Sequence, residues 1–222
     1  MAEVSRIALV HTGAVVIPMT ARFIERELPR VTAVNYLDDR IVADLADERA
    51  ALSVPARVRE LAQAAVDGGA AAILLTCSSI SELAAQTADA VGVPVLRIDE
   101  AMADEAIGIG QRITVIATLP TTCGPTARLI AERAARAGRS PLISSVVVEG
   151  AFDAVASGDR AAHDALVACA IRDAVADADV IVLAQASMAS AVDAVEVAVP
   201  VLTSIESGVK RLRGLVESLP PQ

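Results

Sequence analysis

The stretch RIALV, residues 6–10, recurs in altered form as RITVI at residues 112–116. The stretch VPVL is also present twice, at residues 93–96 and at residues 199–202. The two copies have the same offset in both pairs, since 112 − 6 = 106 and 199 − 93 = 106. Segments that recur in one order at one spacing predict an internal duplication of the fold.

The segments between these anchors follow the same duplication. ILLTC at residues 73–77 corresponds to IVLAQ at residues 181–185, with an offset of 181 − 73 = 108. Short aliphatic runs of this kind alternate along the chain with longer, alanine-rich amphipathic segments. Strands that are apolar on both faces and alternate with helices are typical of parallel sheets covered by helices. The sequence therefore predicts an α/β fold made of two related halves.

The expected elements form two sets of four strands with helices between them. Strands are expected at residues 6–11, 31–37, 71–76, 93–98, 112–118, 142–149, 179–184 and 199–203. Helices are expected at residues 56–67, 79–91, 99–107, 122–137, 160–176 and 204–215. The last helix follows the end of the second repeat, so we expect it to return to the first half. This gives a first α/β domain at residues 1–98 plus 205–222 and a second at residues 99–204.

Small polar residues follow several of the expected strands, in loops at 11–13, 76–79, 118–123 and 185–187. Ligands bind beyond the carboxyl ends of the strands in parallel α/β sheets. Two half-sheets facing each other would form a cleft lined by these loops. We therefore expect the functional site in an interdomain cleft.

Composition and charge exclude several classes of protein. The 222 residues carry a formal net charge of −9, whereas a nucleic-acid surface needs a basic patch. No apolar run reaches the roughly 18 residues of a membrane span, and the N-terminus lacks the layout of a signal peptide. No glycine-rich nucleotide-binding pattern is present. We expect a soluble, cytoplasmic protein that binds neither nucleic acid nor membrane.

Three cysteines, Cys77, Cys123 and Cys169, form neither a disulfide framework nor a metal-ligand pattern. Cys77 follows an expected strand and precedes an expected helix, among the hydroxyl groups of its neighbours. A helix N-terminus favours a thiolate, and nearby hydroxyl and amide groups could hold a carboxylate. The alternative is that Cys77 is a buried strand-end residue, as free cysteines often are. Cys169 lies inside an alanine-rich helix and is expected in the core.

Four segments together resemble the aspartate/glutamate/hydantoin racemase superfamily: LLTCSS at 74–79, IDEAM at 98–102, TLPTT at 118–122 and LAQASM at 183–188. The resemblance spans nearly the whole chain. It implies two parallel-sheet α/β domains related by a pseudo-twofold, no cofactor, and usually a homo-oligomer. It also implies one cysteine from each domain, on opposite faces of a small carboxylate substrate. One thiolate removes the α-proton and the other thiol returns a proton.

Carried over by position, the cysteine of the first domain falls on Cys77. The repeat places Gln185 where the second domain of the family has its cysteine, and an amide cannot act as a base. Cys123, at the start of the helix expected at 122–137, is a possible replacement, although it could also simply fill the first helical turn. Arylmalonate decarboxylase, a one-cysteine type of this superfamily, keeps the second-domain cysteine instead.

The resemblance implies a set of residues for the site. Cys77 and Cys123 are the candidate catalytic residues, and no metal ligand is expected. The candidate substrate-binding residues are His11, Thr76, Ser78, Ser79, Thr118, Thr121, Thr122, Gln185 and Ser187. Their hydroxyl and amide groups would stabilise a carboxylate and its enediolate-like transition state.

Three functions follow as hypotheses. The first is a racemase or isomerase that acts next to the carboxylate of a small amino acid, hydantoin or dicarboxylate. The second is a single-thiol decarboxylase or lyase of the same superfamily. The third is a non-catalytic protein that binds small carboxylates, and the missing second cysteine favours this hypothesis.

Overall fold

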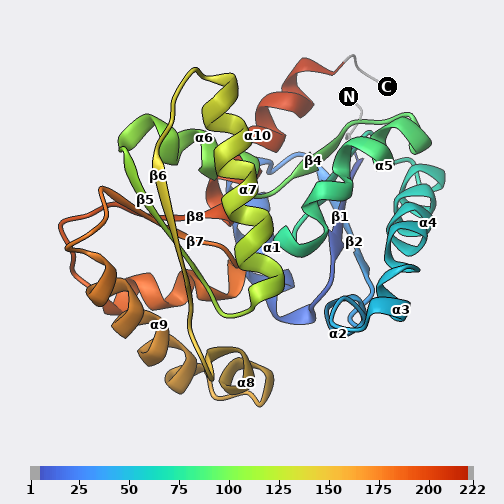
Figure 1. Cartoon of the computed structure of the whole chain (residues 1–222). Coiled ribbons are helices and arrows are strands. Elements are labelled where there is room, and N and C mark those ends of the chain that lie inside the picture. Colours follow the sequence, from blue (N-terminus) through green and yellow to red (C-terminus); the bar gives the residue numbers. More distant parts are fainter. Residues whose placement is uncertain (1–5, 220–222) are drawn as a thin grey trace. The chain divides into compact units, whose positions relative to one another are not determined.

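The computed structural model describes residues 6–219 and contains two four-stranded parallel sheets (Figure 1). The strand order is β2-β1-β3-β4 in the first sheet and β6-β5-β7-β8 in the second. The first four strands are β1 (Arg6–His11), β2 (Thr32–Leu37), β3 (Ala72–Leu75) and β4 (Val95–Arg97). The second four are β5 (Arg112–Ala117), β6 (Leu142–Val147), β7 (Val180–Leu183) and β8 (Val201–Thr203). The predicted α/β class with two parallel sheets is confirmed.

The duplication predicted from the repeats is visible in the burial of the strands. In both β1 and β5 the first residue is exposed and the next five are buried, and all four residues of β3 and of β7 are buried. Strands that are buried on both faces need helices on both sides of the sheet. The central strands of each sheet therefore carry the continuous aliphatic runs seen in the sequence.

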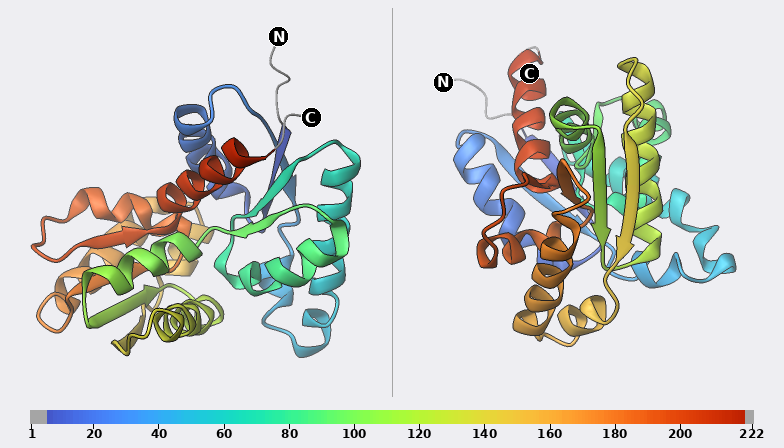
Figure 2. Two further views of the ribbon diagram at one scale, coloured as in Figure 1. Left: turned by 90° about the horizontal axis from the view of Figure 1, so that it is seen from above. Right: turned by 60° about the vertical axis from the view of Figure 1, so that its left-hand side comes forward.

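The chain divides into two compact units: one runs to Ile98 and resumes at Ile205, and the other covers Asp99–Ser204. In the first unit, α4 (Val54–Asp67) and α5 (Ala84–Val91) share a core with one face of the sheet. The helices α1 (Ile17–Glu27) and α10 (Ser204–Ser218) lie side by side (Figure 2). The short elements of this unit are η1 (Ala14–Val16), α2 (Ile41–Asp44), α3 (Glu48–Ala51) and η2 (Ser78–Leu83).

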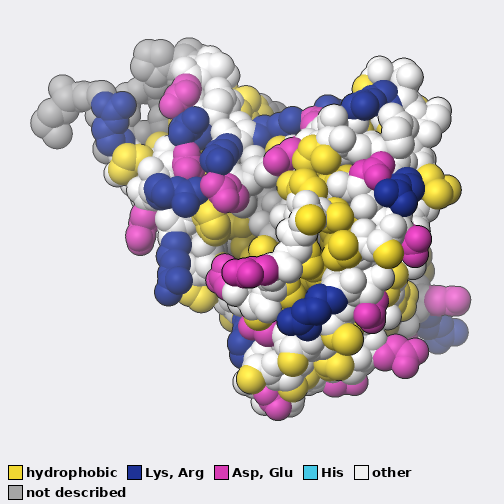
Figure 3. All heavy atoms as spheres, turned by 90° about the vertical axis from the view of Figure 1, so that its left-hand side faces the viewer, with side chains coloured by type: hydrophobic (Ala, Val, Ile, Leu, Met, Phe, Trp, Pro, Cys, Tyr) yellow, Lys and Arg dark blue, Asp and Glu magenta, His cyan; other side chains and the backbone are white. Residues whose placement is uncertain are grey.

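The second unit has the same layered build. Its sheet packs on one face against α6 (Glu100–Ile109) and α7 (Pro120–Arg136), through a cluster that includes Met102 and Ile130. The other face packs against α8 (Ala151–Ala156), α9 (Arg160–Ala174) and η3 (Ala186–Ala194). On the face drawn in Figure 3, acidic and basic side chains are interspersed around apolar ones. None of the helices in residues 6–219 has both the length and the apolar character needed to cross a membrane.

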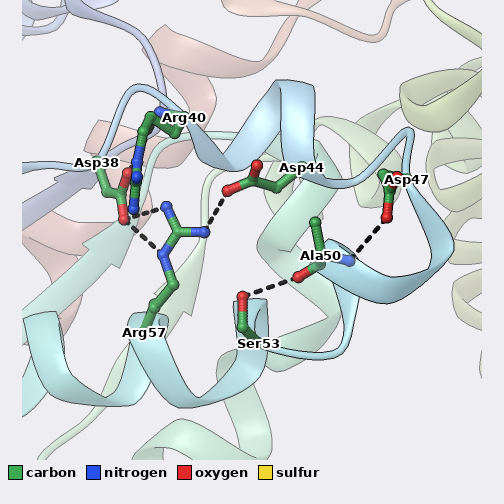
Figure 4. A network of polar contacts seen from close by, with 7 residues as sticks. All are labelled: Asp38, Arg40, Asp44, Asp47, Ala50, Ser53 and Arg57. Carbon is green, nitrogen blue, oxygen red and sulfur yellow. Dashed lines mark hydrogen bonds and ion pairs between the residues drawn. The ribbon is translucent and has the colours of Figure 1, made fainter.

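A polar network ties the loop after β2 to α4 in the first unit (Figure 4). The Arg57 guanidinium donates to Asp38 through Nε at 2.8 Å and also pairs with Asp44. Burial alone would raise the pKa of Asp38, but the bonds from Arg57 and from the Arg40 backbone N–H outweigh burial and lower it. Asp38 is therefore a bonded anchor of this segment.

A close approach of α10 to the bend after β4 depends on Gly208. A Cβ at this position would lie 2.6 Å from the Ile98 carbonyl oxygen and 2.9 Å from Ile98 Cγ1. We expect Gly208→Ala to lower the free energy of unfolding by about 2 kcal/mol, because overpacking forces α10 away from Ile98. Gly214→Ala on the same helix is the matched control, since nothing lies within 4 Å of its Cβ position. Helix propensity predicts that the control stabilises the protein by up to about 1 kcal/mol. Equal effects of the two changes in urea unfolding would contradict this account.

Candidate active site

Cys77 is the second residue after β3 and the N-cap residue of η2. Its carbonyl oxygen accepts hydrogen bonds from Ile80 N at 3.2 Å and from Ser81 Oγ at 3.1 Å. The chain thus turns sharply at the strand end, and a short 3-10 helix precedes α5 where one continuous helix was expected at 79–91. The Cys77 side chain packs against the apolar core cluster but stays partly exposed. Cys77 is thus a partly exposed residue near a strand end.

Gln185 occupies the corresponding place in the second unit. It is the second residue after β7 and the N-cap residue of η3, as Cys77 is for β3 and η2. The two residues also share a backbone conformation, with φ −126° and ψ 123° at Cys77 and φ −126° and ψ 137° at Gln185. The structural repeat therefore places an amide at the position equivalent to the Cys77 thiol.

The Gln185 side chain is fixed by Thr118, which follows β5. The Thr118 backbone N–H donates to Gln185 Oε1 at 2.5 Å, and the Thr118 hydroxyl donates to the same oxygen at 2.9 Å. These contacts bring together two residues that the sequence placed in the site independently. Sequence spacing could not have predicted the hydrogen bonds, because they depend on the rotamer of the glutamine.

His11, at the end of β1, is completely buried, and both of its ring nitrogens are bonded. Nε2 lies 2.8 Å from Asn35 Oδ1, and Nδ1 lies 2.8 Å from Thr76 Oγ1. Thr76 Oγ1 also lies 3.0 Å from the Val10 carbonyl oxygen. The polar side-chain atoms of His11 and Thr76 thus bond within the first unit and support the backbone that leads into Cys77. A contact of either residue with the substrate stays a prediction.

Asn35 is a member of this network that the sequence analysis missed. It lies within β2, where a polar residue interrupts the strand TAVNYL two residues before its end. An asparagine is disfavoured in the interior of a strand, so this position was the signal that could have found it.

Burial lowers the pKa of His11, and the hydrogen bond with Asn35 only partly opposes this effect. In the unfolded chain His11 takes up a proton at its ordinary pKa of about 6.5, whereas in the folded protein it does so at lower pH. The unfolded state therefore binds more protons in this range, and stability falls as pH falls from about 6.5 toward the folded pKa. We expect His11→Gln to flatten this part of the stability profile. Urea unfolding between about pH 5 and pH 8 measures it, and parallel profiles for the two proteins would contradict the assignment.

Cys123 is buried in the core of the second unit. Its side chain is 4% exposed and belongs to the core cluster formed by α6, α7 and one face of the sheet. Cys123 lies on the face of α7 that it shares with the buried Thr126, Leu129 and Ile130. This burial favours the alternative that Cys123 fills the first helical turn, and a role as second base stays a prediction.

Cys169 is exposed, contrary to the expectation that it lies in the core. The buried face of α9 is formed by His163, Val167 and Ile171, which are spaced four residues apart. Cys169 is two residues from Val167, about 200° around the helix, and so faces outward. Its thiol lies 3.8 Å from Asp173 Oδ2.

The remaining candidates lie at the expected strand ends. Ser78 is buried and Ser79 partly exposed in the first turn of η2, while Thr122 is buried and Thr121 partly exposed in the first turn of α7. Ser187 is buried in η3, where its carbonyl oxygen accepts a bond from Arg160 Nη1 at 2.8 Å. Within residues 6–219, no three acidic, histidine or cysteine side chains are grouped as metal ligands would be.

A scan of protein families matches residues 46–212 to the model of the Asp/Glu/hydantoin racemase family. The chain belongs to this family. A search of curated proteins finds no match. The resemblance found in the sequence is therefore confirmed by the family model.

Solved structures of racemase-family members share the fold. A glutamate racemase isoform from Bacillus anthracis is 19% identical, with a TM-score of 0.76 over 96% of this chain and 82% of that chain. A glutamate racemase from Francisella tularensis in complex with D-glutamate is 14% identical, with a TM-score of 0.77 over 96% and 81%. An arylmalonate decarboxylase is 20% identical, with a TM-score of 0.61 over 94% and 92%. The same fold thus includes both racemases and a decarboxylase.

Proposed function

We propose that this family member is a cofactor-independent enzyme that acts at the carbon next to a carboxylate, with Cys77 as its base or nucleophile. The substrate would be a small amino acid, hydantoin or dicarboxylate. The observation that supports this proposal is the strand-end position of the partly exposed Cys77 thiol, with an amide at the equivalent position. The structures of a glutamate racemase with D-glutamate and of arylmalonate decarboxylase are consistent with a carboxylate substrate.

The proposed chemistry begins with the Cys77 thiolate, which removes the proton from the carbon next to the carboxylate. The electron pair of the C–H bond moves into the carboxylate and forms an enediolate. Hydrogen-bond donors would stabilise the added charge, and such electrostatic stabilisation is usually the largest single contribution to catalysis. Ser78, Ser79 and Thr121 are the candidate donors. The thiol then returns the proton to the carbon.

The absence of a second thiol favours one-sided proton transfer. Gln185 cannot accept or release a proton at neutral pH. The buried position of Cys123 makes this residue a poor substitute. We therefore propose that proton removal and return occur on one face of the substrate carbon. Decarboxylation fits the same arrangement: the C–C bond to one carboxylate breaks, CO₂ leaves, and the electron pair stays on the carbon as an enediolate. The Cys77 thiol then protonates this carbon and becomes a thiolate, which takes a new proton from water.

Exchange of the α-proton in heavy water tests the proposal. A panel of enantiopure amino acids, hydantoins and dicarboxylates would be incubated with the protein and followed by proton NMR. We expect loss of the α-proton signal for at least one compound, and loss of CO₂ if the compound is a malonate. No exchange and no CO₂ release across the panel would favour a protein that binds carboxylates without turnover. The interdomain cleft, a homo-oligomeric state and a cytoplasmic location stay predictions.

A further inference from the structure

We propose that the side-chain amide of Gln185 binds an anionic oxygen of the ligand as a fixed N–H donor. The position that holds a second proton-transferring cysteine in the family would thus hold an anion-binding group in this chain. This inference rests on the proposed function in taking the ligand to be the carboxylate substrate. It assigns the contact to Gln185 Nε2, which donates its hydrogen to the ligand oxygen.

The orientation of the amide follows from its partners. Gln185 Oε1 accepts two hydrogen bonds, from the backbone N–H and the hydroxyl of Thr118. If the amide were flipped, its NH₂ group would face the Thr118 N–H, and two donors would oppose each other. Since an amide oxygen has two lone pairs, both are used by Thr118. The NH₂ group must therefore point away from Thr118.

The NH₂ group has no hydrogen-bond partner among residues 6–219, and Gln185 is partly exposed. Two amide hydrogens are thus available to a ligand or to water. The Ser187 hydroxyl, two residues further on, is also without a partner in the described part of the chain and lies in a buried residue. Both groups stand at the carboxyl end of β7, where parallel sheets bind ligands.

Hydrogen bonds from the first turns of α9 anchor the segment that carries these donors. Arg160 Nη1 donates to the Ser187 carbonyl oxygen at 2.8 Å and lies 3.4 Å from Ser190 Oγ. The Ser190 hydroxyl in turn donates to Asp164 Oδ1 at 2.9 Å. These bonds fix η3 before a ligand arrives, and preorganised donors bind charge at little cost of reorganisation.

The chemistry of the donors selects the ligand. An amide N–H and a hydroxyl are uncharged and donate to oxygen, so they suit a carboxylate better than a cation. One carboxylate oxygen can accept from the amide N–H while the other accepts from a further donor. A glutamate at this position would keep the two bonds to Thr118 but would place a negative charge where the donors now stand. Like charges in one site oppose binding.

NMR titration of the ¹⁵N-labelled full chain with malonate tests the assignment directly. The Gln185 side-chain resonance is identified by its absence from the spectrum of Gln185→Met. We expect this resonance to shift and saturate with malonate at up to about 100 mM, and to respond at least about tenfold more weakly to neutral malonamide.

Gln185→Glu should weaken malonate binding by about tenfold or more. Thr118→Val should weaken it by about threefold, because the amide loses one of the bonds that orient it, while Thr118→Ser should bind like the parent.

In the parent protein, the inference is overturned if the Gln185 resonance shows no saturable shift, or if it responds to malonamide as strongly as to malonate. In the variants, it is overturned if Gln185→Glu keeps the malonate affinity of the parent. Equal losses of malonate affinity in Thr118→Val and Thr118→Ser would also overturn it. Thermal unfolding of each variant shows whether it is folded, and the direct shift of the parent resonance does not depend on any variant that unfolds. The titration needs no turnover. Gln185-dependent malonate binding without Cys77-dependent exchange would therefore refute the proposed function alone, and the reverse pattern would refute this inference alone.

Discussion

Replacing Cys77 by alanine is expected to lower the rate of α-proton exchange by about a thousandfold or more. A positioned acid–base group contributes on the order of 10²–10⁴ to a rate, and in this account Cys77 both removes and returns the proton. The change removes a partly exposed side chain at the edge of the core, so we expect the variant to remain folded. Exchange in heavy water, measured by NMR on the best substrate of the panel, gives the rate.

The other two cysteines supply the controls. Cys123→Ala and Cys169→Ser should each retain the exchange rate within about threefold, because the first side chain lies in the core and the second faces outward on α9. A large loss of rate in Cys123→Ala that is not explained by unfolding would restore Cys123 as a catalytic thiol. Unchanged exchange in Cys77→Ala would remove Cys77 from the site.

Replacing Leu74 by alanine is expected to lower the free energy of unfolding by about 3 kcal/mol. Leu74 is fully buried on β3, paired with Leu9 of β1 and Leu96 of β4, and β3 leads into Cys77. Truncation of a fully buried leucine loses transfer free energy and leaves a cavity that the neighbouring strands only partly fill. Urea unfolding followed by circular dichroism measures the change.

Leu52→Ala is the matched control, because this leucine is 82% exposed. It should change the free energy of unfolding by less than about 0.5 kcal/mol. A similar loss in both variants would mean that Leu74 is not a core residue. Exchange activity per folded molecule should survive in Leu74→Ala, since the polar groups of the site are unchanged.

Much of the fold could be predicted from the sequence because it follows from repetition and burial. Strands that are apolar on both faces are recognisable as continuous aliphatic runs, and their order recurs at offsets of 106 to 108 residues. The structure has strands at all eight expected places, although most are shorter than expected. The expected helices did not include α1, α8 or η3. The 3-10 geometry of η2 was also missed, because a short polar turn followed by a helix resembles one longer helix in sequence.

The angular position of each residue around its helix axis explains where Cys123 and Cys169 lie. A helix turns about 100° per residue, so the start of a helix does not determine which of its first residues face a ligand. Cys123 and Thr121 lie in the same turn of α7, yet only Cys123 joins the core. In α9 the spacing of Val167 and Ile171 could have indicated that Cys169 lies on the outer face, but the many alanines obscured this pattern.

The stereochemistry of exchange tests the central claim most directly. An enantiopure substrate of the panel would be incubated in heavy water, and deuterium incorporation and enantiomeric excess would be followed together. With Cys77 acting on one face and Gln185 unable to transfer a proton, the account predicts deuterium incorporation with retained configuration. Loss of configuration at the same rate as deuterium incorporation would contradict it, because protons would then be delivered to both faces.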